Sequence, residues 1–338
     1  MDDAFRSLFP DFAPARICEE HRGGYRLMAG DGEHLAELAG RLRHEAAGRL
    51  DLPATGDWVA FTRHAGSRAV IEGILPRKTC IVRAGAGTAH DVQIIGANID
   101  TMIVVTSLDT DFNARRLERY VALARASGVV PVIVLNKSDG CEDVASYVKD
   151  AGAAAPGVPI LAMSASQRDG IEALDGYLFA GQTLAVVGSS GVGKSTLINA
   201  LVGSDVQSTG AVRANDRRGR HTTTSRSLIP LAGGAVLMDT PGMRELRLQA
   251  DDQALAGAFS EIEALARTCR FTNCSHHAEP GCKVRETVDE TRLASFRKLQ
   301  RETAFVERKG DRAKEALEKE RWKQIQREAR EHMRFKRR

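Results

Sequence analysis

The most informative residues of the chain form the glycine-rich stretch from Gly188 to Ser195, which reads Gly-Ser-Ser-Gly-Val-Gly-Lys-Ser. It follows a short apolar run and precedes a helical pattern, as a phosphate-binding loop does. The glycines let successive backbone N–H groups turn toward phosphate oxygens, the Lys194 ammonium reaches the β- and γ-phosphates, and the Ser195 hydroxyl binds Mg²⁺. We therefore predict nucleotide-phosphate contacts, and a catalytic role for Lys194, within the set Gly188, Ser189, Ser190, Gly191, Val192, Gly193, Lys194, Ser195 and Thr196.

A second phosphate motif, Asp239-Thr-Pro-Gly242, ends another apolar run. The Asp239 carboxylate is suited to hold Mg²⁺ through water, and the Gly242 N–H can sense the γ-phosphate. Alone, these four residues could form an ordinary turn. In a chain that also has a phosphate loop, they predict the second half of a nucleoside-triphosphate site.

The base is predicted by Asn136-Lys137-Ser138-Asp139, which follows an apolar run. The Asp139 carboxylate can accept hydrogen bonds from N1–H and from the exocyclic amine of guanine, whereas adenine has no such donors in that place. Asn136 would brace the loop, and the Lys137 stem would cover the base. Ser164 and Ala165, after the next apolar run, offer a backbone donor to guanine O6. The sequence thus favours GTP over ATP.

Between the two phosphate motifs lies an apolar-free stretch, residues 217–226, which we interpret as the first switch segment. One of its threonines is expected to bind Mg²⁺ and close on the γ-phosphate; we predict Thr223, with the threonines on either side as alternatives. Many GTPases orient the attacking water with a Gln after the Asp-x-x-Gly motif. Here that position is Met243, so we predict that His221 orients the water. The alternative is an exposed histidine without a catalytic role.

The base motif precedes the phosphate loop by about fifty residues, the reverse of the usual order. Joining the original ends of a GTPase domain and opening it elsewhere changes this order while leaving the strands in place. Such a change is sterically feasible because the termini of compact domains often lie close together. We therefore predict a circularly permuted GTPase domain. The segment after Asp239-Thr-Pro-Gly242 then leads directly into the C-terminal region.

The sequence Cys269-x4-Cys274-x-His276-x5-Cys282 offers three thiolates and one imidazole. This is a closed set of four ligands for a structural zinc ion. His277 is an alternative fourth ligand, and disulfides are the alternative to a metal. The other cysteines, Cys18, Cys80 and Cys141, are scattered, and we expect them to be ordinary reduced thiols.

Short apolar runs alternate with helical patterns in the middle of the chain, which predicts a doubly wound α/β sheet. The expected strands cover residues 101–108, 130–136, 158–165, 183–188 and 235–240, and helices are expected over 114–128 and 195–202. Before this region, alternating runs around Asp31-Gly32 and Ala65-Gly66-Ser67 predict hairpins of a small β-barrel, with the oligonucleotide-binding (OB) fold as first choice and a β-sandwich as the alternative. The expected domains are 1–95, an OB-fold and candidate RNA-binding barrel; 96–250, the permuted GTPase domain; and 251–338, a mainly helical zinc-binding domain with a basic tail.

Charge is distributed unevenly along the 338 residues. Residues 297–338 contain 16 Lys and Arg against 8 Asp and Glu, a net charge of +8, whereas the whole chain carries +4. Trp322 and Phe335 lie among these basic residues, a combination that suits a nucleic-acid backbone, although a solvated charged helix has the same composition. No apolar run reaches the roughly 18 residues of a membrane span, and no signal peptide is evident. We expect a cytoplasmic monomer without a membrane partner.

Two other function classes fit part of this pattern. One is an ATP-dependent kinase of small molecules, which Asp139 and the Ser164-Ala165 pair disfavour. The other is an RNA-binding scaffold with a structural nucleotide, which the set Ser195, Thr223 and Asp239 disfavours. Nucleotide preference and turnover distinguish these classes from a GTPase.

The chain resembles the ribosome small-subunit-dependent GTPase A (RsgA/YjeQ) family over nearly its full length. The resemblance is carried by HRGGYRLM, GDWVAF, DFNARRLERYVALA, VLNKSD, GSSGVGKSTL, GRHTTTSR, DTPGMRE and CRFTNCSHHAEPGC, all in the order of the family. It implies an OB-fold, a permuted GTPase with Mg²⁺ and GTP, and a zinc domain coupled to the switch regions. It also implies a late role in maturation of the small ribosomal subunit, contacts with the rRNA, and GTP hydrolysis stimulated by the subunit.

Overall fold

The computed structural model describes residues 2–21, 23–63, 68–84, 92–109, 111–203, 227–239 and 259–301, the last range without residues 273, 291, 295 and 299. Among the described helices, none has the length and apolar character needed to cross a bilayer. The basic tail after Arg301 lies outside the described residues.

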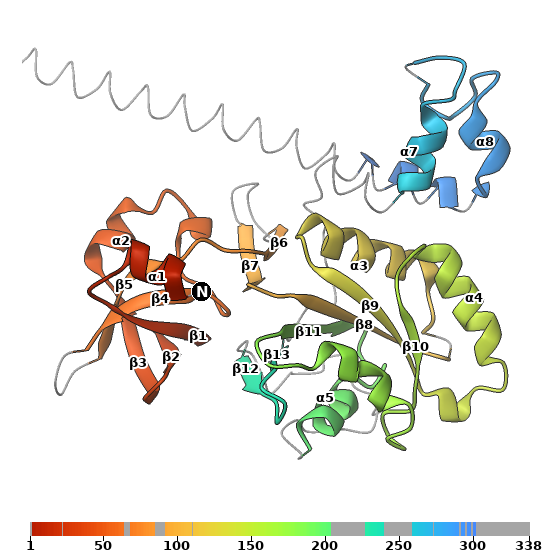
Figure 1. The fold of residues 1–338 in the computed structure, drawn as a ribbon. Helices are drawn as coiled ribbons and strands as arrows, with labels where there is room; N and C mark the ends of the chain where they lie inside the picture. The colour runs from red at the N-terminus through yellow and green to blue at the C-terminus, as the bar shows by residue number, and fades with distance from the viewer. Residues whose placement is uncertain are drawn as a thin grey trace, which may run out of the picture.

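Five strands of the N-terminal region close into a barrel (Figure 1). They are β1 (Ala13–His21), β2 (Gly24–Ala29), β3 (Gly32–Leu38), β4 (Trp58–Thr62) and β5 (Ala69–Ile74). The sheet order is β1-β2-β3-β5-β4, and β4 pairs again with β1; only β3 and β5 are parallel. This is the predicted OB topology. The predicted β2–β3 hairpin is present with Gly32 at a φ of 124°, whereas the tip between β4 and β5 lies outside the described residues.

Buried side chains that fill the barrel interior alternate along the strands with more exposed ones. In β5, Ala69 and Ile71 are buried, while Val70 between them is partly exposed. They pack with Ile17, Leu27 and Phe61 from the other strands. Helix α1 (Asp2–Leu8) covers the barrel through a separate small apolar cluster, and α2 (Gly40–Glu45) and the 3-10 helix η1 (Arg49–Asp51) connect β3 to β4.

Six strands form the nucleotide-binding sheet. They are β8 (Thr101–Ser107), β9 (Val130–Asn136), β10 (Ile160–Ala162), β11 (Thr183–Gly188), β12 (Ser227–Pro230) and β13 (Val236–Asp239). Their order is β10-β9-β8-β11-β13-β12, and only β12 is antiparallel to its neighbour. The chain runs outward from β8 to β10 and then returns to place β11 beside β8. The predicted circular permutation is visible in this order, because the strand that leads to the phosphate loop lies inside the sheet but late in the chain.

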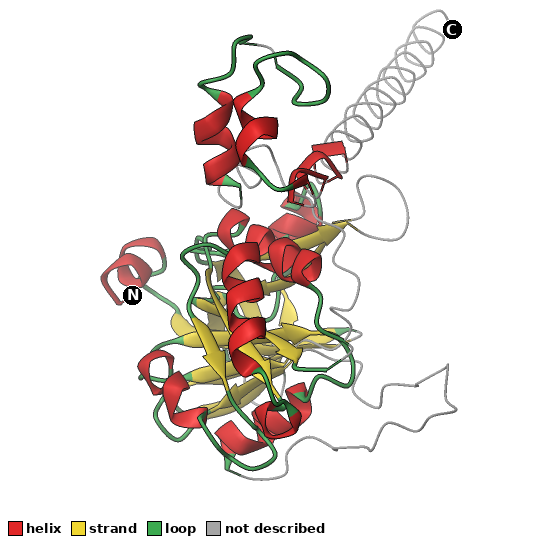
Figure 2. Ribbon diagram, turned by 90° about the vertical axis from the view of Figure 1, so that its right-hand side faces the viewer, coloured by secondary structure: helices red, strands yellow, loops and turns green. Residues whose placement is uncertain are grey.

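Helices cover both faces of this sheet (Figure 2). They are α3 (Ala114–Ala126), α4 (Val144–Ala154) and α5 (Lys194–Val202), with the 3-10 helices η2 (Ser138–Gly140) and η3 (Ile171–Tyr177). All residues of β8 are buried, and successive side chains enter different cores. Met102 and Val104 pack in the cluster that contains α3, whereas Ile103 and Val105 pack in the cluster that contains α5. The predicted doubly wound α/β fold is confirmed.

The barrel is joined to the nucleotide-binding sheet by backbone pairing and by polar side chains. Glu19 of β1 pairs with Ser227 of β12, so that both sets of strands belong to one 11-stranded sheet. The Arg16 guanidinium donates to Thr183 Oγ1 at 2.7 Å and to the Asn98 carbonyl at 3.3 Å. Strand β11 begins at Thr183, so one arginine of the barrel contacts the strand that leads to the phosphate loop.

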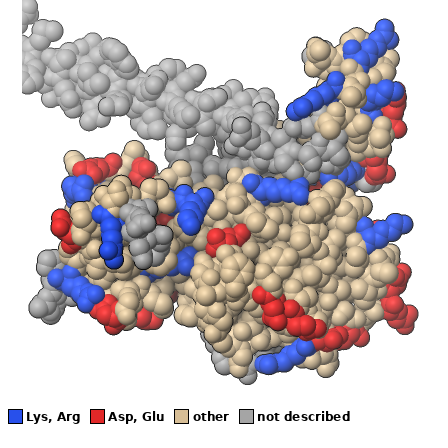
Figure 3. All heavy atoms as spheres, viewed as in Figure 1, with Lys and Arg blue, Asp and Glu red and all other residues tan. Residues whose placement is uncertain are grey.

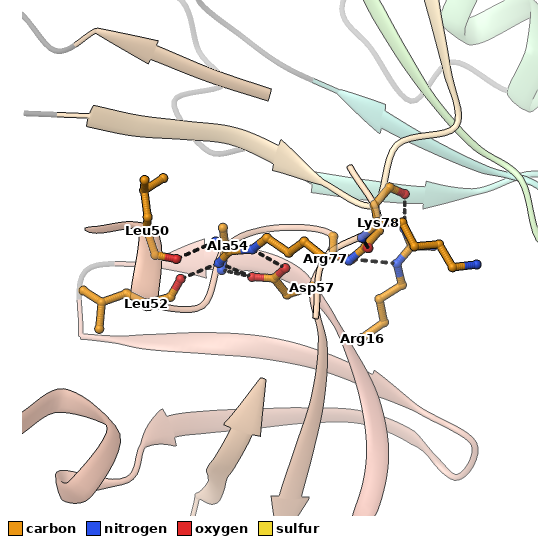
Figure 4. A network of polar contacts seen from close by, with 9 residues as sticks. Arg16, Leu50, Leu52, Ala54, Asp57, Arg77 and Lys78 are labelled. Carbon is orange, nitrogen blue, oxygen red and sulfur yellow. Dashed lines mark hydrogen bonds and ion pairs between the residues drawn. The ribbon is translucent and has the colours of Figure 1, made fainter. Parts of the chain in front are cut away.

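A second arginine, Arg77, connects loops within the N-terminal region (Figure 4). Arg77 donates two hydrogen bonds to the fully buried Asp57 carboxylate, at 2.8 and 2.7 Å, and others to the carbonyls of Leu50 and Leu52. The same carboxylate accepts from the Ala54 N–H at 2.8 Å. Next to it, Gly56 has a φ of 97°, and a Cβ there would lie 2.1 Å from the Ala97 carbonyl oxygen. The loops therefore pack too closely for a side chain at position 56.

Two further parts complete the described chain. Strands β6 (Cys80–Ala84) and β7 (Val92–Ala97) form a separate two-stranded sheet, so the barrel strands end at Ile74 rather than near the predicted domain limit of 95. The C-terminal module contains α7 (Ser260–Ala266), α8 (Lys283–Thr287) and further helical residues up to position 301. The domain limits at 95 and 250 remain predictions.

Candidate guanine-nucleotide site and cysteine cluster

The strand ends bring the predicted nucleotide motifs to one edge of the sheet. Asn136 is the last residue of β9, Gly188 of β11 and Asp239 of β13. These strands are parallel, with Val186 opposite Asp239 and Gly188 opposite Val105. Ligands of open α/β sheets bind at this carboxyl edge. Segments that are far apart in the sequence therefore meet where a nucleotide would bind.

The phosphate loop has the backbone that its glycines predict. Gly188, Gly191 and Gly193 all have positive φ values, of 145°, 85° and 94°. A Cβ at Gly188 would lie 2.1 Å from the Val105 carbonyl oxygen. Helix α5 starts at Lys194, so its N-terminal N–H groups face the loop, an arrangement that binds anions. The Lys194 ammonium donates to the Ser189 carbonyl, and Ser195 and Thr196 are half-buried in the first turn of α5.

One buried side chain connects three of the predicted motifs. Asn136 Nδ2 donates to the Val192 carbonyl of the phosphate loop at 2.8 Å. Asn136 Oδ1 accepts from the Ala165 N–H at 3.0 Å. A Cβ at Gly193 would lie 2.2 Å from Asn136 Nδ2, so this position needs glycine for the contact with the base motif. The sequence predicted that Asn136 braces its own loop; the structure shows that it also positions the phosphate loop and the Ser164-Ala165 segment.

The rest of the base motif forms a tight turn. Lys137 has a φ of 65°, and the Ser138 N–H donates to the Met163 carbonyl at 3.2 Å. Asp139 is exposed in η2, where its carboxylate is accessible to a ligand. Ser164 is buried, and its hydroxyl lies 3.1 Å from that of Ser166. The Asp139 carboxylate, which the sequence predicts to select guanine, is thus exposed at this edge of the sheet.

Asp109 is a polar residue of this site that the sequence analysis missed. Its carboxylate lies 3.0 Å from the Lys137 ammonium. The only sequence signal is its place two residues after β8, next to the edge at which the other motifs gather.

One of the predicted switch residues, Asp239, lies in the part of the chain that the structure describes. Asp239 is half-buried at the end of β13. Gly242, His221 and Thr223 lie outside the described residues, as does the whole segment 217–226. Their roles remain predictions.

Cys269, Cys274, His276 and Cys282 come together between α7 and α8, with ligand atoms within 4.8 Å of one another. His276 Nδ1 lies 3.5 Å from Cys282 Sγ and 3.8 Å from Cys269 Sγ. The neighbouring His277 is exposed and does not belong to this group, and none of the six cysteines is in a disulfide. Three thiolates and one imidazole at this spacing suit a tetrahedral zinc ion.

The local electrostatics of the cluster differ from one thiol to another. Burial opposes ionisation of Cys269, but hydrogen bonds from the backbone of Val284 and Lys283 favour its thiolate, and the pKa of Cys269 lies below its usual value. Burial, together with the neighbouring thiols, raises the pKa of Cys274 to about 11. Metal binding releases thiol protons, so the backbone groups at the start of α8 prepare Cys269 for a ligand role.

Comparison with known proteins identifies the family. The sequence profile described as RsgA GTPase matches residues 74–249. A protein of Opitutus terrae named small ribosomal subunit biogenesis GTPase RsgA is 45% identical over 96% of this chain and 94% of its own length. A protein of Lactiplantibacillus plantarum, small ribosomal subunit biogenesis GTPase RsgA 2, is 48% identical over 86% of this chain and 83% of its own. This chain belongs to the RsgA GTPase family.

Solved structures agree with this assignment. The crystal structure of YjeQ from Thermotoga maritima superposes with a TM-score of 0.66 at 26% identity, over 86% of this chain and 98% of that one. The structure of YloQ, described as a circularly permuted GTPase, has a TM-score of 0.58 at 20% identity over 89% and 96% of the two chains and supports the fold. The ABC transporter profile also matches residues 171–333, a range that includes the phosphate loop but not Asn136 or Asp139. As an RsgA GTPase, the protein hydrolyses GTP.

Proposed function

We propose that this RsgA GTPase acts late in the maturation of the small ribosomal subunit and that binding to the subunit stimulates its GTP hydrolysis. The observation that carries the nucleotide part of this proposal is the Asn136 side chain, which connects the base motif to the phosphate loop and to Ala165. This arrangement supports one composite guanine-nucleotide site. The relatives named above are small ribosomal subunit biogenesis GTPases, and the chain covers most of their length.

In this proposal the residues of the site have separate tasks. Asp139 selects guanine through two accepted hydrogen bonds, and a backbone donor next to Ala165, whose own N–H donates to Asn136, contacts O6. The phosphate loop, with Lys194, binds and orients the phosphates. Ser195, Thr223 and Asp239 would hold Mg²⁺, which supplies charge stabilisation of the phosphates when bound. Gly242 senses the γ-phosphate, and His221 orients the water.

The cysteine cluster is proposed to hold one structural zinc ion. The four ligand atoms form a closed set with no position for substrate, so the metal would supply folding energy rather than chemistry. Such a site gives the short C-terminal module a fixed shape. The zinc module follows the second switch motif in the chain, which supports the proposed coupling between the module and the switch regions.

The proposed partner is the small subunit with its rRNA, contacted by a cytoplasmic monomer. Figure 3 shows Lys and Arg side chains on the barrel and on the C-terminal module, interspersed with Asp and Glu. Residues 297–338, at the C-terminal end of the chain, carry a net charge of +8. Phosphate contacts by these residues would make the affinity for rRNA fall with increasing salt.

GTP and ATP turnover, measured with and without purified small subunits, tests this proposal. We expect GTP-specific hydrolysis that is slow alone and faster by at least about tenfold with subunits, because the subunit orders the catalytic groups. His221→Ala should lose the stimulation while retaining GDP binding, and His44→Ala, at an exposed position of α2, serves as the control. If the subunit still stimulates the His221→Ala variant, His221 is not the residue that orients the water. An absence of stimulation in the unmodified protein overturns the ribosomal role.

A further inference from the structure

We propose that Asp109 is a positioning residue for guanine recognition, which sets the Lys137 side chain in place before the base arrives. The inference rests on the proposed guanine-binding role of the base motif. It assigns a task to a residue outside that motif, at the end of a different strand. Asp109 Oδ2 and Lys137 Nζ are 3.0 Å apart, although 28 positions separate the two residues in the chain.

The Asp109 carboxylate is itself held from the other side. Its Oδ1 atom accepts a hydrogen bond from the Ser107 hydroxyl at 2.7 Å and another from the Asp111 N–H at 2.9 Å. Ser107 is fully buried as the last residue of β8. One oxygen of the carboxylate is thus fixed to the sheet, and the other is directed at the lysine. The carboxylate has a defined orientation without any contribution from Lys137.

The electrostatics of the pair agree with an ionised carboxylate. Burial opposes ionisation of Asp109, but hydrogen bonds from Ser107, Asp111 and Lys137 outweigh it, and the pKa of Asp109 lies below its usual value. Both side chains are about two-fifths exposed, at 41% and 40%. Exposed ion pairs add little to folding stability. We therefore expect the pair to act by positioning the lysine rather than by stabilising the fold.

Lys137 is constrained at both ends by these contacts. Its backbone has a φ of 65° and follows Asn136, which is buried and bonded to two other segments. Its ammonium is held by Asp109. A free lysine side chain loses much of its rotamer freedom when it packs on a ligand, and a side chain that is already ordered avoids most of that cost. The ion pair should thus raise affinity for guanine nucleotides without touching the phosphates.

The test is a double-mutant cycle with Asp109→Asn and Lys137→Met in the full-length protein. Dissociation constants for fluorescent GDP would be measured for each single variant and for the combination. We expect Asp109→Asn to weaken GDP binding about fivefold, with a raised KM for GTP and an unchanged kcat. In the Lys137→Met background the same change should alter affinity by less than about twofold, because the residue through which Asp109 acts is gone.

Asp111→Asn is the matched control. Asp111 lies in the same loop, and its side chain pairs with Arg116 of α3 at 2.9 Å. Because the substitution keeps the backbone N–H that donates to Asp109, it should leave GDP affinity within about twofold. Raising the salt concentration should reduce the difference between the wild type and Asp109→Asn, since a partly exposed ion pair is screened. If Asp109→Asn instead acted by disturbing the structure in general, the loss of GDP affinity would not shrink with added salt. It would also persist in the Lys137→Met background.

Two results would overturn the inference. One is an unchanged GDP affinity in Asp109→Asn, and the other is an equal loss with and without Lys137. A parallel Asp139→Ala variant separates this inference from the function on which it rests. If Asp139→Ala leaves GDP binding intact, the proposed base motif is wrong; if it weakens binding strongly while Asp109→Asn does not, only the role of Asp109 is wrong.

Discussion

The barrel and the C-terminal module are attached to the nucleotide-binding sheet in different ways. The barrel is attached by strand pairing between β1 and β12 and by Arg16, which donates to Thr183 of β11 and to the Asn98 carbonyl. In the described part of the module, apolar residues such as Phe259 and Leu293 pack in one cluster with Leu117 of α3, and polar contacts are made by the Arg292 guanidinium. This guanidinium donates to Glu118 of α3 and to the Ala154 carbonyl of α4, both at 3.0 Å, and stacks over Phe259 at 4.8 Å.

This difference predicts two levels of cooperativity. A shared sheet and buried polar groups couple the barrel to the nucleotide site, so the two should unfold together. The module has its own cysteine cluster and, among the described residues, no strand paired with the sheet. It should therefore open, without unfolding the rest, once its apolar contact with α3 and the Arg292 contacts separate. A movable module suits a region that is proposed to respond to both the nucleotide and the ribosomal subunit.

Loss of the proposed zinc ion should have the largest effect, and this effect should be confined to the module. Structural zinc contributes on the order of 10 kcal/mol to the folding of small metal-binding units. Removal of the metal by a chelator, or Cys282→Ser, should therefore abolish amide protection in residues 259–301. Hydrogen exchange measured by mass spectrometry checks this. Simultaneous loss of protection in the barrel would contradict separate units, and full retention in the module would contradict the zinc site.

Asp57→Ala should produce the next largest effect, on the barrel and the sheet together. The substitution leaves the Arg77 guanidinium, which is 15% exposed, without its carboxylate and removes the acceptor for the Ala54 N–H. Breaking a buried ion pair in this way costs about 3–5 kcal/mol. Denaturant unfolding would measure the loss. Asp31→Ala is the control, since Asp31 pairs with Arg63 at a position that is 41% exposed.

Arg292→Ala should have a smaller effect, limited to the attachment of the module. The change breaks the Arg292–Glu118 pair, whose side chains are 13% and 7% exposed, and removes the contact with Phe259, which together weaken the attachment by about 3 kcal/mol. We expect faster hydrogen exchange in α7 and α8 and little change in the main unfolding transition. Arg285→Ala, an exposed arginine of α8, should leave both unchanged. A large drop in the stability of the whole protein would show that the two attachments are equivalent.

The sequence predicted the parts of the fold that depend on local patterns. Strand β11 has the limits that its apolar run predicted, 183–188, and the glycines of the phosphate loop have the backbone that the motif requires. Strand β10 is shorter than predicted, because the segment after Ala162 turns into the loop that includes the Ser164–Asp169 bridge. The three-part organisation was also predictable, since each part has its own periodicity and composition.

Contacts between distant side chains could not be predicted in this way. Arg16 meets Thr183 across 167 positions and Arg292 meets Glu118 across 174, and neither pair has a motif. Asp109 was missed for the same reason, because its partner follows a neighbouring strand rather than its own. Such contacts depend on how assembled elements face one another. Motifs indicate the residues that touch the ligand, whereas the residues that position them require the structure.

The most direct test of a composite guanine site is the nucleotide preference of Asp139→Asn. Guanine offers two donors to a carboxylate, whereas xanthine has a carbonyl in place of the amine and matches an amide that donates and accepts. We predict that the wild type prefers GDP over xanthosine diphosphate by about 100-fold or more and that the variant reverses this order. A variant that still prefers GDP, or a wild type that binds ADP equally well, would contradict the account.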